Sequence, residues 1–215
     1  MTDAVETLRW AVANVPRLAF ATGFGAEGCV LIDLIAREKL PIDIFTLDTG
    51  VLFPETYALW KALEAKYGVT IRGVAPVVAP ASIDKLWLTD SDRCCDLRKV
   101  QPLRAALAGF GGWITAIRRD QTPERANARA VEQDAKFGLV KINPLVTWTH
   151  DDVWGHLYAN DVPTNALHAK GYPSIGCAPC TSPVIPGEHL RAGRWRGAQK
   201  TECGLHTPEQ KADKL

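Results

Sequence analysis

Two pairs of cysteines, far apart in the chain, are the residues best suited to chemistry. Cys94 and Cys95 are adjacent, whereas Cys177 and Cys180 are separated by two residues. Deprotonated thiols bind soft metals, and four of them suit either a zinc ion or an iron–sulfur cluster. Adjacent residues on a helix point about 100° apart, which favours two corners of a 4Fe–4S cluster over one tetrahedral ion. A zinc site and unrelated buried thiols stay open as alternatives.

A further cysteine, Cys203, lies near the C-terminus between Lys200 and His206, and both neighbours favour a thiolate. A thiolate is a nucleophile, and a cysteine on an arm can visit a site and then be presented to a second protein. An incidental free thiol is the alternative interpretation. The remaining cysteine, Cys29, falls on an apolar helix face, so we expect it in the core.

Basic residues follow the first cysteine pair at helical spacing. Arg98 comes four residues after Cys94, and Lys99 comes four residues after Cys95. On a helix each base therefore shares a face with a sulfur. Cations there would offset the charge of the thiolates, and Lys99 would also be able to hold an anionic ligand beside the metal. The alternative is an ordinary solvated basic face.

A glycine-containing turn, Thr22–Glu27, follows a predicted strand and opens a predicted helix. Backbone N–H groups at such a turn point at anions, and glycine lets the backbone approach them closely. Gly23, Gly25 and Gly28 formally match the dinucleotide fingerprint, and Asp48 follows about 20 residues later at a strand end. A tight turn that needs glycine for its dihedral angles is the alternative.

This turn is one of three polar segments at the carboxyl ends of predicted strands. The others are Asp48–Gly50 and the pair Arg118 and Arg119. In an open parallel sheet, ligands bind beyond those ends. We therefore expect a nucleotide site there, with a solvated edge as the alternative for the two arginines.

The elements that must position these residues alternate between strand and helix, which predicts a mostly parallel sheet with helices on both faces. We expect helices over 3–14, 26–35, 54–66, 92–107 and 149–158, and strands over 17–21, 42–47, 69–74, 112–117 and 140–144. Residues 75–91 are expected to be looser. After Asp161 the chain is rich in proline and glycine without a clear period. We expect an α/β domain over 1–180 and an irregular arm over 181–215.

The composition argues against several classes of protein. The chain has 215 residues and is 47% hydrophobic, enough for a full core that does not need its six cysteines as disulfides. With 25 basic and 24 acidic residues the net charge is +1, which does not favour nucleic acid. The first residues lack the pattern of a signal peptide, and no apolar run approaches the ~18 residues of a membrane span. These features predict a reduced cytoplasmic protein without a membrane or nucleic-acid partner.

Several motifs together resemble the assimilatory adenylyl-sulfate (APS) reductases of the phosphoadenylyl-sulfate reductase family. The resemblance covers about residues 17–207 and implies an adenine-nucleotide-hydrolase-like (PP-loop) fold. It is carried by Leu47–Gly50, Phe53–Tyr57, Cys94–Lys99, Ile117–Gln121, Ile142–Leu145, Ser174–Thr181 and Lys200–His206. The loop after the first strand departs from the family pattern, because Gly23 stands where a serine is common.

The resemblance also implies roles for individual residues. It assigns a 4Fe–4S cluster to Cys94, Cys95, Cys177 and Cys180, and the attacking thiolate to Cys203. That thiolate would take a sulfonyl group from APS, release AMP, and pass sulfite on when reduced thioredoxin or glutaredoxin attacks the adduct. A homo-oligomer is also implied. The implied substrate contacts are Thr22, Gly23, Phe24, Gly25, Leu47, Asp48, Lys99, Arg118, Arg119, Arg191, Arg194 and His206.

The cysteine pairs also bear on the substrate. Family members that act on the 3′-phosphorylated nucleotide, PAPS, usually lack these pairs, so we expect APS, with PAPS or dual use as the alternative. Nicotinamide-dependent hydride transfer is a remoter alternative that leaves the cysteines unexplained. A zinc-stapled RNA-thiolation enzyme of the same fold is another, and the near-neutral charge disfavours it.

Overall fold

The computed structural model describes residues 3–198, 200 and 202–206, and a six-stranded sheet lies at the centre of this part of the chain. The strand order is β3-β2-β1-β4-β6-β5. Neighbouring strands are parallel except β5 and β6, which are antiparallel. The mostly parallel sheet is therefore confirmed. The strands are β1 (Leu18–Thr22), β2 (Asp43–Leu47), β3 (Arg72–Val74), β4 (Gly112–Ile114), β5 (Val131–Asp134) and β6 (Leu139–Ile142).

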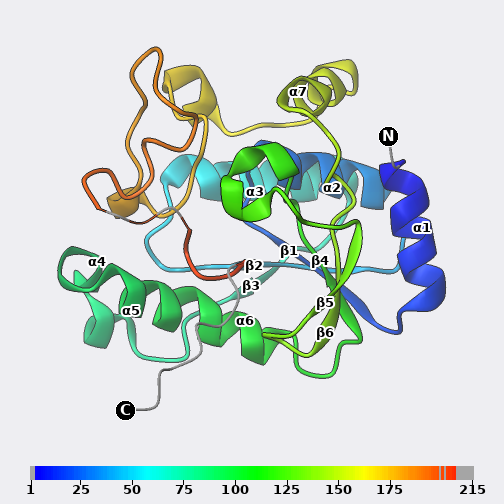
Figure 1. Cartoon of the computed structure of the whole chain (residues 1–215), viewed down its shortest axis with the longest axis horizontal. Coiled ribbons are helices and arrows are strands. Elements are labelled where there is room, and N and C mark those ends of the chain that lie inside the picture. The colour runs from blue at the N-terminus through cyan, green and yellow to red at the C-terminus, as the bar shows by residue number, and fades with distance from the viewer. Residues whose placement is uncertain (1–2, 199, 201, 207–215) are drawn as a thin grey trace.

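Helices cover both faces of this sheet (Figure 1). On one face α1, α2, α3 and α7 share a large apolar cluster with the strands, and Leu8, Leu31 and Leu63 are fully buried in it. On the opposite face α6 packs through Leu103 against Trp113. The helices are α1 (Ala4–Asn14), α2 (Ala26–Arg37), α3 (Pro54–Tyr67), α4 (Leu86–Thr89), α5 (Ser91–Cys95), α6 (Gln101–Ala106) and α7 (His150–Ala159).

Helix ends follow from local chemistry. The Asp3 side chain caps α1 by accepting the N–H of Val5 at 2.9 Å. Gly68 ends α3 in the left-handed region, with φ of 63°. Thr149 caps α7 and forms a capping box with Asp152. The predicted beginnings and ends of these helices are confirmed to within about two residues.

The cysteine-bearing helix differs from the prediction of one regular helix over 92–107. It consists of α5, a π-helical turn η2 (Asp96–Val100), and α6. Pro102 has no N–H to donate to the carbonyl of Arg98, and the N–H of Gln101 bonds instead to Asp96 five residues back. The proline therefore accounts for the irregular turn.

Other differences concern strand length and irregular segments. β3 and β4 are shorter than predicted, and the edge strand β5 was missed because Val131–Asp134 lacks apolar alternation. The looser stretch contains α4 and the 3₁₀ turn η1 (Pro80–Ile83). Further 3₁₀ turns are η3 (Arg119–Gln121), η4 (Pro123–Arg125), η5 (Ala166–Lys170) and η6 (Ala178–Cys180).

The chain after η6 is irregular and returns toward the sheet (Figure 1). Thr181 forms a bridge with Arg194, and the N–H of Trp195 bonds to the carbonyl of Cys180 at 2.9 Å. The proposed boundary between a domain and an arm stays a prediction, and residues 207–215 of that arm lie outside the described residues. Among the described helices, none has the length and apolar character needed to span a membrane.

Candidate active site

A cavity of about 300 Å³ opens where the chain changes direction in the sheet. The chain runs from β1 outward to β2 and β3, then returns to β4 on the other side of β1. Thr22 at the end of β1 and Gly23 just after it line the cavity together with Ala116 and Arg118, which follow β4. This is the switch point at which doubly wound sheets bind ligands beyond the strand ends.

The turn after β1 is shaped by close packing. The Thr22 hydroxyl accepts the N–H of Phe24 at 3.1 Å, and a Cβ on Gly28 would lie only 2.8 Å from that hydroxyl oxygen. Gly28 therefore lets α2 approach the turn. Gly23 and Gly25 line the cavity, whereas Phe24 is buried in the core and stacks on Trp60. A substrate contact from the Phe24 side chain is not supported by its position.

Two other predicted contacts also lie away from the cavity. The Asp48 carboxylate accepts the Tyr57 hydroxyl at 2.6 Å and the N–H of Gly50 at 3.0 Å, and it does not line the cavity. Arg119 is exposed and donates to the carbonyl of Ala128 at 2.8 Å. Leu47, next to Asp48, does line the cavity. Sequence motifs thus located the right segments but not always the inward-facing residues.

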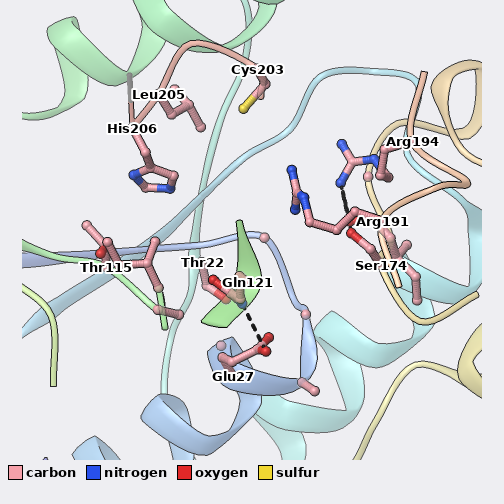
Figure 2. Close-up of a pocket in the computed structure, with 18 of the residues that line it drawn as sticks. Thr22, Glu27, Thr115, Gln121, Ser174, Arg191, Arg194, Cys203, Leu205 and His206 are labelled. Atoms are coloured by element: carbon pink, nitrogen blue, oxygen red, sulfur yellow. Dashed lines mark hydrogen bonds between the residues drawn. The ribbon is translucent and has the colours of Figure 1, made fainter. Parts of the chain in front are cut away.

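Arg118 lies at the cavity wall with its charge already matched. Its guanidinium donates to Glu27 at 2.9 Å and to Asp120 at 2.6 Å. Gln121 donates to the same Glu27 oxygen at 3.0 Å, a bond shown in Figure 2. Arg118 therefore organises this wall and contributes less positive charge than its sequence position implied.

Arg194, unlike Arg118, has an aromatic ring and a hydroxyl beside its guanidinium. Its guanidinium lies over the Trp195 ring at 4.5 Å and contacts Ser174 at 3.4 Å. Its Nε is buried and has no hydrogen-bond partner among the described residues. Buried polar groups normally have partners, so this wall fits an anionic ligand. Figure 2 shows Arg191 and Arg194 side by side, opposite Cys203 and His206.

The C-terminal arm supplies the other wall of the cavity through Cys203, Leu205 and His206. The His206 ring stacks on Trp113, with centroids 5.8 Å apart. Burial, together with the charges of Arg125 and other cations, holds the pKa of His206 well below its ordinary value. The lowered pKa favours the neutral ring, which can offer a hydrogen bond to a ligand.

A second, smaller cavity is lined by all four paired cysteines, Cys94, Cys95, Cys177 and Cys180. Among the described residues, no three His, Cys, Asp or Glu side chains are close enough to hold a single metal ion. Four thiols that line one cavity form a soft donor set, which suits a metal group bound through thiolates.

Lys99 and Cys177 line both cavities and therefore connect them. Burial opposes the charged form of Lys99, but the thiolates of Cys177 and Cys203 outweigh it and raise the Lys99 pKa. The pKa of Cys177 is lowered overall. Burial alone would raise it, but the charge of Lys99 and a hydrogen bond with Thr49 outweigh the effect of burial. The predicted position of Lys99, beside both the cysteines and an anion site, agrees with this geometry.

Arg98, the other predicted base, has a mainly structural position. Its guanidinium is buried and donates to the carbonyl oxygens of Thr49 and Ile83. Burial raises the pKa of the Cys94 thiol, and Arg98 opposes that shift. Arg98 thus ties the cysteine helix to the loop that follows β2.

The sequence motifs did not identify several of the residues that line the cavity. They include Glu27, Trp113, Gln121, Arg125 and Ser174. Gln121 and Ser174 lie inside the recognised motifs, which was a usable signal. Glu27 lies at the end of the recognised turn, but its contacts with Arg118 and Gln121, like that of Arg125 with Glu202, join segments far apart in the chain.

The sheet order and the cavity at its switch point define an α/β enzyme of the adenine-nucleotide-hydrolase-like class. The chain belongs to the phosphoadenosine phosphosulfate reductase family, whose domain matches residues 17–183. It is 47% identical to adenosine 5′-phosphosulfate reductase 1 of Bacillus subtilis over 94% of this chain and 90% of that protein. The corresponding protein of Geobacillus kaustophilus is 43% identical over 94% of this chain and 89% of its own.

Solved structures agree with this assignment. The crystal structure of a phosphoadenylyl-sulfate reductase from Candida auris, a phosphate complex, matches with a TM-score of 0.76 and 33% identity. It covers 85% of this chain and 90% of that one. An FMN adenylyltransferase of Candida glabrata matches with a TM-score of 0.60 at 16% identity, covering 84% of this chain and 64% of its own. The latter likeness shows the fold alone.

Proposed function

We propose that this enzyme reduces adenosine 5′-phosphosulfate (APS) to sulfite and AMP in sulfate assimilation, through a sulfonate adduct on Cys203. One observation carries the proposal: the Cys203 thiol lines the same strand-end cavity as Lys99, Arg191 and Arg194. A nucleophile is thus opposed to cations that suit a sulfate and a phosphate. The high identity to proteins named adenosine 5′-phosphosulfate reductases supports the choice of substrate.

In the binding step, the anion is held from two sides. Lys99 and Arg194 supply positive charge, and the turn that carries Gly23 and Gly25 supplies backbone N–H groups at the start of α2. Leu47, the last residue of β2, gives an apolar surface for the nucleoside. The contacts proposed for Phe24, Asp48 and Arg119 are not retained.

In the transfer step, the Cys203 thiolate attacks the sulfur of APS. A bond forms between Sγ and that sulfur, the bond from sulfur to the phosphate oxygen breaks, and its electron pair leaves with AMP. The cations stabilise the charge that develops on the leaving phosphate. The neutral His206 ring lines the cavity and offers a hydrogen bond to this region.

In the release step, a dithiol protein such as reduced thioredoxin or glutaredoxin attacks Sγ of the adduct and displaces sulfite. Its second thiol then resolves the mixed disulfide and returns Cys203 as a thiol. The two electrons come from the dithiol, which ends as a disulfide. A thiol that must be reduced again after each turnover suits the cytoplasm. The homo-oligomer implied by the resemblance stays a prediction.

The four paired cysteines would hold a 4Fe–4S cluster, which supplies a fixed charge and an organising core beside the anion site when bound. Their shared cavity and soft donor set support this cofactor. Lys99 lies with Cys177 at the wall common to both cavities, and it is the cation that lines both of them.

The test is mass spectrometry of the intact holoenzyme after incubation with APS and without reductant. We expect one sulfonate adduct, on Cys203, and its loss with release of sulfite when reduced thioredoxin is added. An adduct on any other cysteine would contradict the assignment. A parallel incubation with PAPS distinguishes an APS enzyme from a dual or PAPS-specific one, because only the accepted nucleotide yields the adduct.

A further inference from the structure

Glu202, the residue before the proposed nucleophile, is a buried carboxylate held by two arginines. Its oxygens lie 2.7 Å from the guanidinium of Arg125 and 3.3 Å from that of Arg191. The Thr122 hydroxyl lies 3.4 Å away. The side chains of Glu202 and Arg125 are only 4% and 9% exposed. A carboxylate is buried this deeply only where cations and hydrogen bonds compensate for the lost water.

Both arginines line the cavity, but only Arg125 lies outside the arm, because Arg191 is itself an arm residue. Arg125 ends η4, beyond the carboxyl end of β4, and both it and Arg191 line the cavity that Cys203 also lines. Glu202 therefore fastens the arm to the wall that receives the ligand. The adjacent Cys203 is half-buried at this position.

The other contacts of the arm are weaker or less specific. Lys200 pairs with Asp92 at 2.6 Å, and the Asp92 side chain is 88% exposed. The carbonyl of Gly204 accepts the ammonium of Lys136 at 2.6 Å. The Lys200 side chain is only 9% exposed, but water solvates its partner Asp92, so this pair contributes less than a pair whose two partners are both buried. A fully buried pair leaves an uncompensated charge when one partner is removed. The His206 ring also packs on Trp113, with centroids 5.8 Å apart. Among the ionic contacts of the Cys203 segment, we expect those of Glu202 to decide whether it is docked.

We propose that Glu202 is a positioning residue that docks Cys203 over the cavity through its ion pairs with Arg125 and Arg191. It does not touch the reacting atoms. Arg191 pairs with this carboxylate and also lines the ligand cavity. The same guanidinium therefore takes part both in docking the thiol and in binding the anion. The role in catalysis rests on the proposed function, whereas the docking itself does not.

The experiment measures two rates in the holoenzyme variant Glu202→Gln, which keeps the size of the side chain and removes its charge. The first is alkylation of Cys203 by iodoacetamide without nucleotide, followed by peptide mass spectrometry. The second is single-turnover formation of the sulfonate adduct with APS. We expect alkylation to be at least about tenfold faster and adduct formation at least about tenfold slower than in the unmodified chain.

Two internal controls separate docking from general damage. Cys29 is buried in the core, and its burial raises its pKa to about 12, so it must stay unalkylated in any folded variant. Glu38→Gln removes a carboxylate that pairs with Arg9 on the surface, and both rates should match the unmodified chain.

Arg125→Gln should repeat the effects of Glu202→Gln. The double variant should lose less than the sum, because it leaves no unpaired charge between them.

The outcomes are distinguishable. If Glu202→Gln leaves both rates unchanged with Cys29 protected, the docking role is wrong. Faster alkylation of Cys203 with normal adduct formation would support the docking role of Glu202 but show that docking does not position the thiol for catalysis. If the unmodified chain forms no adduct with APS while Glu202→Gln still alkylates faster, the proposed function fails and the docking stands.

Discussion

The two walls of the cavity are held in different ways. The strand-end wall is fixed by backbone: β1 and β4 pair in register, and the turn after β1 packs Gly28 against Thr22. The arm wall has no strand to hold it among the described residues, and it is fastened by side chains such as Glu202 and His206. We therefore expect the strand-end wall to be rigid and the arm wall to be detachable, and we call them the rigid wall and the detachable wall.

This difference suits a reaction that uses two partners in turn. The nucleotide needs a rigid anion site, because catalysis by fixed charges depends on preorganisation. In the proposed reaction the nucleophile later meets a second protein, which requires contacts that can be broken without unfolding the sheet. A few buried ion pairs meet that need, since each is strong when formed yet local. The predictions below test each wall separately.

The largest effect is expected for Cys203→Ser, on the detachable wall. A serine hydroxyl is far less nucleophilic than a thiolate, so turnover should fall by on the order of 10⁴-fold or more. Binding of AMP should be retained, because the strand-end wall is untouched. Steady-state sulfite release and equilibrium binding measure the two quantities. Loss of AMP binding would show that the two walls are not separable.

Lys99→Ala is expected to have the next largest effect, because Lys99 lines both cavities. Removal of one fixed donor to a developing anion typically lowers the rate by about 10²–10³-fold. Iron content and the visible absorption of the proposed cluster should stay near those of the unmodified chain, since the cysteines remain. Unaltered substrate affinity and turnover would remove Lys99 from the mechanism.

Features that depend on sequence neighbours were the most predictable. The cap at Thr149, the turn at Gly25 and the grouping of Lys99 with the cysteines follow from spacing along one element. The π-helical turn was not anticipated, although Pro102 contained the reason for it. Local chemistry is legible in a sequence when the interacting atoms are within about one helical turn.

Side-chain direction and long-range pairing were the features that sequence could not supply. Phe24, Asp48 and Arg119 lie in the correct loops but point into the core, to Tyr57 or to solvent. The pairing of Glu202 with Arg125 joins residues 77 positions apart. No pattern encodes such a contact, because it exists only once the arm has returned to the sheet.

Two glycine variants test the rigid wall by stability. Gly28→Ala places a Cβ 2.8 Å from the Thr22 hydroxyl, and overpacking of this kind costs about 1–3 kcal/mol. Gly155→Ala is the matched change in α7, where nothing lies within 4 Å of the added Cβ. That variant should gain up to about 1 kcal/mol, since alanine favours a helix interior. Chemical denaturation measures both, and equal effects would show that the Thr22–Gly28 contact does not constrain the turn.

The smallest effect is expected for Asp92→Asn, at the exposed tether of the detachable wall. Asp92 pairs with Lys200, but its side chain is 88% exposed, so water and salt already weaken the attraction. The bond from Lys200 to the carbonyl of Ser91, at 3.0 Å, remains available. Alkylation of Cys203 should therefore rise by less than about fivefold, and the difference should shrink further at high ionic strength. An increase as large as that of Glu202→Gln would mean that the arm is held by surface charge, and the contrast between a buried pair and an exposed tether would fail.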